Sequence, residues 1–344
     1  MGFYSMKNIK YFLLLLIMFS IPSFGKNFKE LFVIYEPIED STLIDKSINQ
    51  AFNTMIYRLS GVSSPSNIWR IINAGNARKD FITSYSVKNI DEKSYLQVNF
   101  DKNLLIEKFK ELEIPIVGNS RPVILFLIKI DSGNSAPYFV TMENDDSAIN
   151  KLIRDSINKY SESRGIFLEL PELDLSDKIN LLNYEKLIDS KDYISSKYKF
   201  DTLITLDLIK IGLDNWSATG DIETKYNAEE FNKNFINDFN EFIENIINKI
   251  LKKNLIDISR ETSIKIKINN IKNVENYKNS RTAIESLVGV KNLKIEKFEI
   301  DNITYSVDIF GDFNSIQKQV SVNSFFEIIE SSFNEEYLHL AYKQ

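Results

Sequence analysis

A nearly unbroken apolar run, Val123 to Ile130, constrains the fold of this chain more than any other feature of its sequence. A strand that is continuously Val, Ile, Leu and Phe is typical of a sheet with helices on both faces. The sequence therefore predicts an α/β layered domain over residues 119–256. The other elements expected in this domain are a helix over 145–164, a short strand over 166–170, a helix over 190–198, paired strands over 202–211 and 216–224, and a long amphipathic helix over 228–253.

Residues 28–118 carry the pattern of a smaller β-α-β-β-α module. Apolar residues recur at helical spacing from Ile44 to Leu59, and Gly61 follows as a C-terminal cap that can adopt positive φ. Asp101 is expected to cap a second helix. Strands are expected over 31–35, 81–87 and 95–100, and residues 62–80 read as turns.

Residues 257–344 are predicted to form a third domain with the order βαββαβ, which is that of a ferredoxin-like sandwich. The strongest local signal is the two-residue turn Asp301-Asn302 between two strand patterns, which favours a hairpin. The expected elements are strands over 264–268, 290–300, 303–310 and 337–342, and helices over 275–287 and 312–320. The whole chain is thus expected to be a multi-domain α+β and α/β protein.

Residues 1–25 read as a cleavable signal peptide. Lys7 and Lys10 supply a basic region, an apolar stretch follows, and Ser23 and Gly25 have the small-x-small spacing that signal peptidase requires. Cleavage is predicted after Gly25, and either Met1 or Met6 could be the start. The apolar stretch is shorter than the roughly 20 residues that span a bilayer, although an uncleaved anchor remains an alternative. The mature chain is therefore expected in the periplasm without a membrane span.

Composition excludes several classes of function. The 344-residue chain has no cysteine, which excludes disulfides, thiol catalysis and cysteine-ligated metal sites. Its net charge is −6, with both signs spread along the chain, which argues against nucleic acid as a partner. His339 is the only histidine, and no G-x-S-x-G, G-x-G-x-x-G or Walker A sequence occurs. No catalytic residue, cofactor or metal is predicted.

An ordered set of short motifs resembles the Gram-negative periplasmic proteins grouped as domain of unknown function 2066. The resemblance covers most of the mature chain and is strongest between Leu31 and Ile130. It implies export but no activity, because none is assigned to that family. The chain has Val117 where the family pattern has a Trp before the glycine of Pro-x-x-Gly. The matching motifs are Leu31-Phe32-Val33, Ala51-Phe52, Arg58-Leu59-Ser60-Gly61, Tyr95 to Asp101, Pro115 to Gly118, Arg121 to Ile124, Tyr198 to Asp201 and Trp216 to Gly220.

Four residues are candidates for a structural or interaction role. Arg58 ends a helix, Asp101 ends a strand, and Arg121 precedes the buried strand. We expect Asp101 either to pair with one of these arginines, which would join the first module to the second, or simply to cap its own helix. Trp216, like Trp69, could contact a glycan or protein partner, but a tryptophan in a strand more often packs in a core.

Two groups of acidic residues remain: Glu143, Asp145 and Asp146, and Glu169, Glu172, Asp174 and Asp177. The first stands at a helix start and the second in an apparent polar loop, so capping and solvation are expected of both. Paired carboxylates can also hydrolyse glycosidic bonds.

The leading functional prediction is a non-catalytic binding or assembly module of the cell envelope, with an envelope protein as partner. A carboxylate-dependent hydrolase of an envelope polymer is the alternative, and a third hypothesis is peptidoglycan binding without catalysis. A pocket with two carboxylates about 5–10 Å apart would favour the hydrolase. An open sheet edge or a broad apolar patch would favour binding.

Overall fold

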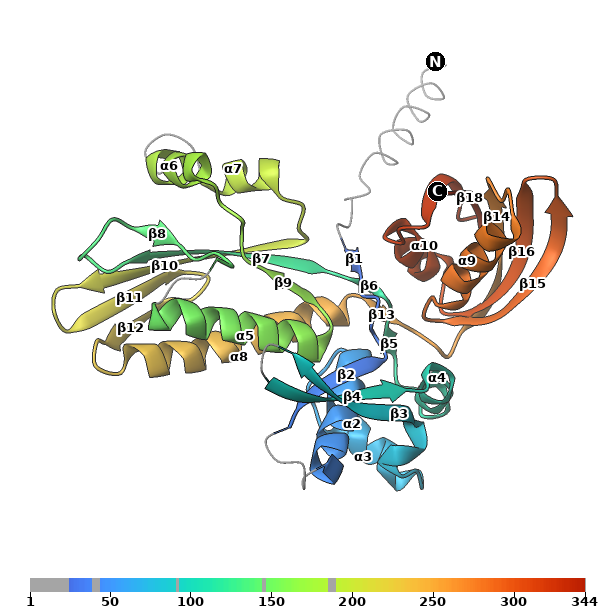
Figure 1. Cartoon of the computed structure of the whole chain (residues 1–344), viewed down its shortest axis with the longest axis horizontal. Coiled ribbons are helices and arrows are strands. Elements are labelled where there is room, and N and C mark those ends of the chain that lie inside the picture. Colours follow the sequence, from blue (N-terminus) through green and yellow to red (C-terminus); the bar gives the residue numbers. More distant parts are fainter. Residues whose placement is uncertain (1–24, 39–43, 91–92, 144–146, 185–189, 344) are drawn as a thin grey trace, which may run out of the picture.

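The computed structural model describes residues 25–38, 44–90, 93–143, 147–184 and 190–343. It is a mixed α/β structure with several sheets, as the sequence predicts. Figure 1 shows three bodies, with the N-terminal module (blue to cyan) between the middle module (green to yellow) and the C-terminal module (orange to red). No helix in the described part of the chain is both long and apolar enough to cross a membrane.

The middle module contains the predicted central strand. Side chains of β7 alternate between two apolar clusters: Phe126 packs against helices α5 and α8, whereas Leu125 packs against α6 and α7. Burial on both faces explains why β7 has no polar alternation. The sheet order is β12-β11-β10-β7-β8, with β9 also paired to β7, and β10 and β9 both run parallel to β7. The elements are β7 (Val123–Asp131), β8 (Tyr138–Phe139), α5 (Ala148–Arg164), β9 (Phe167–Glu169), α6 (Leu175–Tyr184), α7 (Ser190–Lys197), β10 (Thr202–Ile211), β11 (Asn215–Gly220), β12 (Thr224–Asn227) and α8 (Phe231–Lys252).

The N-terminal module is a three-stranded antiparallel sheet with the order β2-β4-β3. The apolar face of α2, including Phe52 and Met55, packs against Leu96 and Val98 of β4, and all four side chains are buried. The stretch 62–80, expected to be turns, contains helix α3 and the start of a 3-10 turn. The apolar pair Ile68 and Ile71 provides the buried side of α3. The elements are β2 (Val33–Pro37), α2 (Ile44–Ser60), α3 (Ser66–Asn73), the 3-10 turn Arg78–Phe81, β3 (Ile82–Ile90), β4 (Lys93–Phe100) and α4 (Lys102–Glu111).

The C-terminal module has one strand more than the predicted βαββαβ order. The sheet order is β15-β16-β14-β18-β17, and β18 runs parallel to β14. Strand β17, which the sequence did not reveal, pairs with β18, so the last strand lies inside the sheet rather than at its edge. The elements are β14 (Glu261–Asn269), α9 (Val274–Glu285), β15 (Val290–Glu299), β16 (Asn302–Phe310), α10 (Phe313–Ser321), β17 (Phe326–Ser332) and β18 (Tyr337–Tyr342).

Short strands and one buried glutamine connect the modules. Strand β1 (Lys26–Asn27) pairs with β6 (Ser120–Arg121), and β5 (Ile116–Val117) pairs with β13 (Leu255–Ile256). Gln319 of α10 is buried; its Oε1 accepts from the Asn119 amide at 3.1 Å and its Nε2 donates to the Val288 carbonyl at 2.8 Å. A Cβ on Gly118 would come within 2.9 Å of the Gln319 side chain. Glycine in the Pro-x-x-Gly motif therefore allows the C-terminal module to approach.

Candidate functional site

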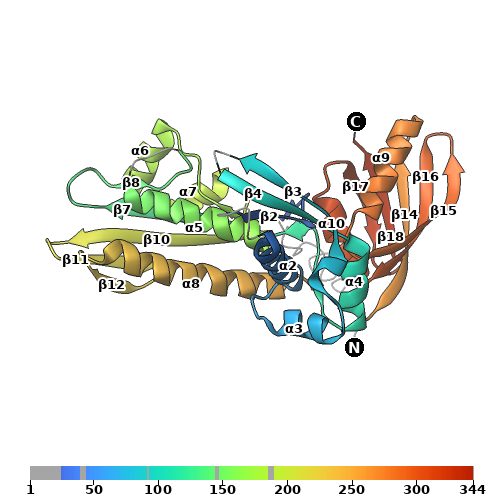
Figure 2. The same ribbon diagram turned by 60° about the horizontal axis from the view of Figure 1, so that its bottom comes forward.

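Two helices of different modules end at the same place. Arg58 lies in the last turn of α2 and Arg164 is the last residue of α5, and these helices are in contact (Figure 2). Arg121, from β6, extends its guanidinium between the two helix ends. We call Arg58, Arg121 and Arg164 the arginine junction. Its three side chains are buried, and Arg121 is 0% exposed.

Arg121 binds backbone carbonyls rather than a carboxylate. Its Nη1 donates to the Arg58 carbonyl at 3.1 Å and to the Arg164 carbonyl at 3.5 Å, and its Nη2 donates to the Val117 carbonyl at 3.1 Å. The carbonyl groups at a helix C-terminus lack intrahelical donors and carry a partial negative charge. One guanidinium thus satisfies the ends of both helices and fixes the first module on the second.

Arg58 makes the reciprocal connection. Its Nη1 donates to the Val33 carbonyl at 2.7 Å, and its Nη2 donates to the carbonyl of Glu162 in the last turn of α5. The guanidinium also lies 5.3 Å from the ring centre of Phe28. Gly165 caps α5 at φ +57°, and a Cβ there would come within 2.9 Å of the Arg58 side chain. Two constraints therefore favour glycine at position 165: the positive φ of the cap, and the lack of space for a Cβ beside the Arg58 side chain.

The charges in the junction are poorly hydrated. Burial lowers the pKa of Arg58 and of Arg164 to about 10. Burial, together with the neighbouring Arg58 and Arg164 cations, lowers the pKa of Arg121 well below its usual value. The Nε atoms of all three arginines are buried and have no partner among the described residues. Arg164 Nη2 donates to Asn248 Oδ1 at 2.9 Å, so the acceptors of the junction among the described residues are carbonyl and amide oxygens. Its enclosure assigns it a structural role.

The predicted ion pair between Asp101 and an arginine is wrong. Asp101 Oδ1 accepts from the Asn103 and Leu104 amides at 2.9 and 3.0 Å, so it caps its own helix, α4. Among the described residues, no ion pair joins Asp101 to Arg58 or Arg121, whose donors point to carbonyls. The expected connection between the modules exists, but the acceptors are main-chain atoms.

Trp216 packs in the middle module. Its ring stacks on Phe231, at the start of α8, with centroids 4.3 Å apart and planes 7° apart. Tyr226 lies opposite Trp216 on the neighbouring strand and also contacts Phe231. Trp216 is only half-buried, but Phe231 covers one face of its ring. Trp216 therefore packs at the end of the core and does not present a free aromatic surface.

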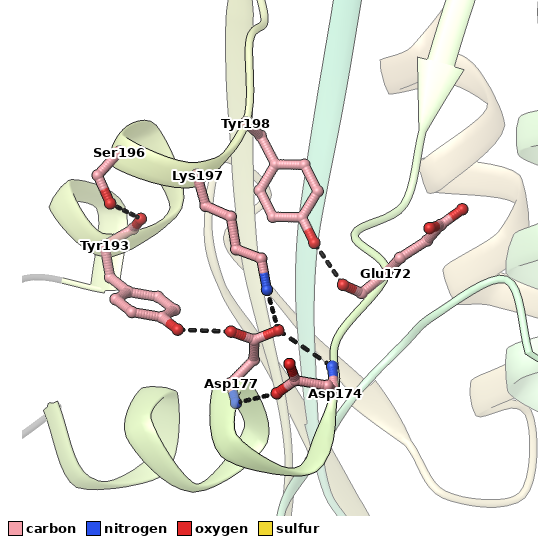
Figure 3. A network of polar contacts seen from close by, with 7 residues as sticks. All are labelled: Glu172, Asp174, Asp177, Tyr193, Ser196, Lys197 and Tyr198. Atoms are coloured by element: carbon pink, nitrogen blue, oxygen red, sulfur yellow. Dashed lines mark hydrogen bonds and ion pairs between the residues drawn. The ribbon is translucent and has the colours of Figure 1, made fainter.

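The second acidic group forms a structural clamp, shown in Figure 3. Asp174 and Asp177 cap each other's amides: the Asp177 amide donates to Asp174 Oδ1 at 2.7 Å, and the Asp174 amide donates to Asp177 Oδ2 at 3.0 Å. They flank the start of α6, whereas the sequence predicts a polar loop for this acidic group. Tyr193 and Lys197 of α7 both donate to the Asp177 carboxylate, so the same residue ties α7 to α6.

The clamp keeps Asp177 ionised. Burial alone would raise the pKa of Asp177, but the hydrogen bonds from Lys197, Tyr193 and the Asp174 amide outweigh it and lower the pKa to about 2. A carboxyl group with so low a pKa cannot act as a general acid near neutral pH. In the first acidic group, Asp145 and Asp146 lie outside the described residues.

A shallow recess of about 430 Å³ lies between α4 and α9. Its two carboxylates, Asp101 and Glu285, already have hydrogen-bond or ion-pair partners. Asp101 caps α4, and Glu285 pairs with Arg281 at 2.8 Å. Lys102 Nζ donates to the Glu285 and Leu287 carbonyls at 2.7 and 3.0 Å, and burial lowers its pKa to about 8. Among the described residues, no group of three or more acidic or histidine side chains could hold a metal ion.

Strand β3 is the candidate interaction site. From Ser84 to Ile90 it pairs with β4 in an uninterrupted register, and none of the described strands lies beside its other edge. Tyr85 and Val87 lie opposite Val98 and Leu96, so they share the face that α2 covers over β4. They are nevertheless 53% and 55% exposed.

The other edge strands in the described part of the chain are short or protected. Strand β15 has two register shifts and three lysines, and β17 has one shift and two glutamates, Glu327 and Glu330. Strand β2 ends at Pro37, and β8, β9 and β12 have two to four residues. Bulges, charges, proline and shortness are the usual devices that prevent edge pairing. Strand β3 carries a single charge, Lys88, and its one shift lies at its start.

Sequence reasoning found Arg58 and Arg121 but missed Arg164, Tyr85 and Val87. The pair Arg164-Gly165 at the end of a helix pattern was the available signal for the third arginine. Tyr85 and Val87 were inside a segment predicted to be extended, but edge position depends on sheet order, which local sequence does not encode. Searches of protein families, curated proteins and solved structures found no match to this chain. The resemblance to domain of unknown function 2066 therefore stays a prediction.

We predict that Arg121→Met lowers the free energy of unfolding by about 3 kcal/mol or more, because it leaves buried helix-end carbonyls without donors. The free energy of unfolding of Arg121→Lys should lie between those of Arg121→Met and the wild type, since one ammonium cannot reach all three acceptors as a planar guanidinium does. Urea unfolding measures the change. Arg281→Lys, at an exposed pair, is the control and should shift stability by less than about 0.5 kcal/mol. An Arg121→Met variant as stable as the wild type would contradict the role of the junction.

We predict that Asp177→Asn increases amide hydrogen exchange in α6 and α7, since a neutral amide cannot hold Lys197 as strongly. The pKa of Asp177 is lowered to about 2 from an ordinary value of 3.8. The ionised carboxylate therefore stabilises α6 and α7 fully above pH 3.8, and this stabilisation is lost as the pH falls towards about 2. The difference in amide hydrogen exchange between variant and wild type should therefore become smaller as the pH falls from about 5 to about 3. Asp155→Asn, on the exposed side of α5, is the control. A difference that does not depend on pH would argue against the clamp.

Proposed function

We propose that this chain is an exported, non-catalytic binding module of the cell envelope, and that the β3 edge is its protein-binding site. The observation that supports the proposal is the unprotected edge of β3 in a chain whose other described edges are short, bulged or charged. Free main-chain donors and acceptors along such an edge can receive an extended segment of another chain. Specificity would come from the alternate side chains, apolar on one face and polar on the other.

The side chains of β3 fit a protein partner. Tyr85 and Val87 form an apolar row on the face shared with α2. On the opposite face, Ser84 accepts a hydrogen bond from Asn99 Nδ2 at 2.9 Å, and Ser86 and Lys88 continue a polar row. An incoming strand with the same alternation would extend both the core and the polar face. A glycan or a nucleic acid offers no such regular main-chain pairing.

The alternative hydrolase has less support. In the α6–α7 clamp, Asp174 and Asp177 cap each other's amides, and Asp177 also binds Lys197. In the α4–α9 recess, Asp101 caps α4 and Glu285 pairs with Arg281. These contacts occupy the carboxylates that a hydrolase would use as its acid and its nucleophile.

Export to the periplasm and the family relationship are further parts of the proposal. Cleavage after Gly25 would leave β1 intact, because β1 begins at Lys26 and pairs with β6. Lys26 also forms an ion pair with Glu169. We propose in addition that the chain is related to domain of unknown function 2066. The C-terminal module would be a ferredoxin-like variant in which β18 is inserted between β14 and β17.

We predict that the mature protein, recovered from the periplasm of a Gram-negative host, begins at Lys26. Gly25→Leu should retain the leader, because signal peptidase requires a small residue at this position, whereas Phe24→Leu should be processed normally. N-terminal sequencing and the intact mass of the fractionated protein are the measurements. Recovery of the chain from the cytosol with its leader attached would refute export.

We also predict that a photo-crosslinking amino acid at position 85 or 87 yields discrete protein adducts in living cells. The same amino acid at position 249, on the exposed side of α8, is the control and should yield none. Val87→Lys should reduce the adduct from position 85 at least about fivefold, because it places a charge in the apolar row. Absence of adducts at both β3 positions would refute binding at this edge.

A further inference from the structure

The sequence of β3 is complementary to itself. Two antiparallel copies related by a two-fold axis perpendicular to the sheet keep the same face on the same side, so opposite residues must share a face. The register with β4 shifts between Ile82 and Ser84, so the regular part of β3 runs from Ser84 to Ile90. If the axis passes at Ser86, residues 84 to 88 of the two copies pair with one another. Tyr85 then lies opposite Val87 of the second copy, and Ser84 lies opposite Lys88.

We propose that a second copy of this chain pairs with β3 in this register, which joins two three-stranded sheets into one six-stranded antiparallel sheet. This inference rests on the proposed function, since it uses the same edge, and it names the partner. The sheet order would be β2-β4-β3, then β3, β4 and β2 of the second copy. Both α2 helices would lie on the same face.

The chemistry of the pairs favours this register. The two Tyr85–Val87 pairs are aromatic with β-branched, a combination that stabilises antiparallel sheets, and they cover each other's exposed surface between the two α2 helices. Strand β3 has no acidic residue, and its one charged residue, Lys88, faces a serine. An axis at Lys88 would place two lysines opposite each other, and an axis at Val87 would place Tyr85 opposite Asn89, which removes both aromatic pairs.

The strand edge alone is small for an interface. Interfaces below about 1,200 Å² in total are typical of transient complexes, so the dimer is expected to be in reversible equilibrium with the monomer. Such an equilibrium is compatible with a strand that stays soluble when it is unpaired, since Lys88 and the serines keep its outer face polar.

A cysteine-free chain allows a direct test of the register. In the purified full mature chain, Ser86→Cys places one cysteine opposite itself, at a distance suited to a disulfide. Mild oxidation should convert at least about tenfold more of this variant to covalent dimer than of Asn89→Cys, because position 89 does not lie opposite itself in this register. Asn89 is the matched control because it lies on the same exposed strand. Equal yields from the two variants, or no dimer from either, would overturn the proposal.

A charge exchange provides an independent test by analytical ultracentrifugation. Tyr85→Glu and Val87→Lys should each weaken dimer formation at least about tenfold, because each breaks both apolar pairs. The double variant should recover most of the loss, since the carboxylate introduced at position 85 would then face the ammonium introduced at position 87 of the other copy. Absence of recovery in a folded double variant would refute this register. Failure of dimer formation while position 85 still yields adducts with another protein would refute the second copy but leave the proposed binding function intact.

Discussion

The buried guanidinium of Arg121 is the interaction on which the arrangement of the modules depends. It has no carboxylate partner among the described residues, and its charge is balanced by carbonyls of α2, α5 and the segment before β6. A small displacement of either helix would leave a buried cation and buried carbonyls without partners, and each unsatisfied group costs about 1–3 kcal/mol. The junction therefore opposes small shifts between the first two modules, and Arg58 and Gly165 reinforce it by their close fit.

Much of the fold could be predicted from local patterns. The apolar run at Val123 to Ile130 predicted a strand buried on both faces, and Leu125 and Phe126 do enter separate apolar clusters. Among the elements that escaped, two did so for identifiable reasons. Helix α6 begins at Leu175, between Asp174 and Asp177, and these acidic residues indicate a polar loop unless their mutual capping is known. Strand β17 has a register shift after Ile328, which destroys the two-residue period that identifies a strand.

The site could be predicted only in part, because its acceptors have no sequence signature. Arg58 and Arg121 stand out as charged residues beside apolar elements, and a carboxylate is the obvious partner to seek. Asp101 was the nearest candidate, but a residue at a helix start satisfies two amides at once without leaving its own segment. The acceptors that the arginines do use are main-chain carbonyls. Their position depends on where α2 and α5 end relative to each other, which is information about the whole fold.

The same dependence explains why β3 differs from the other edges. The core face of the first module is covered by α2, which the arginine junction fixes against α5. The segment that follows the first module in the chain, at Gly118 and Asn119, contacts Gln319 of the third module. These contacts occupy the sides of the first module that face its neighbours, whereas Ser84 to Ile90 stays exposed. A chain that pairs with β3 would therefore meet a sheet whose position relative to the other modules is already set, so little ordering would oppose binding.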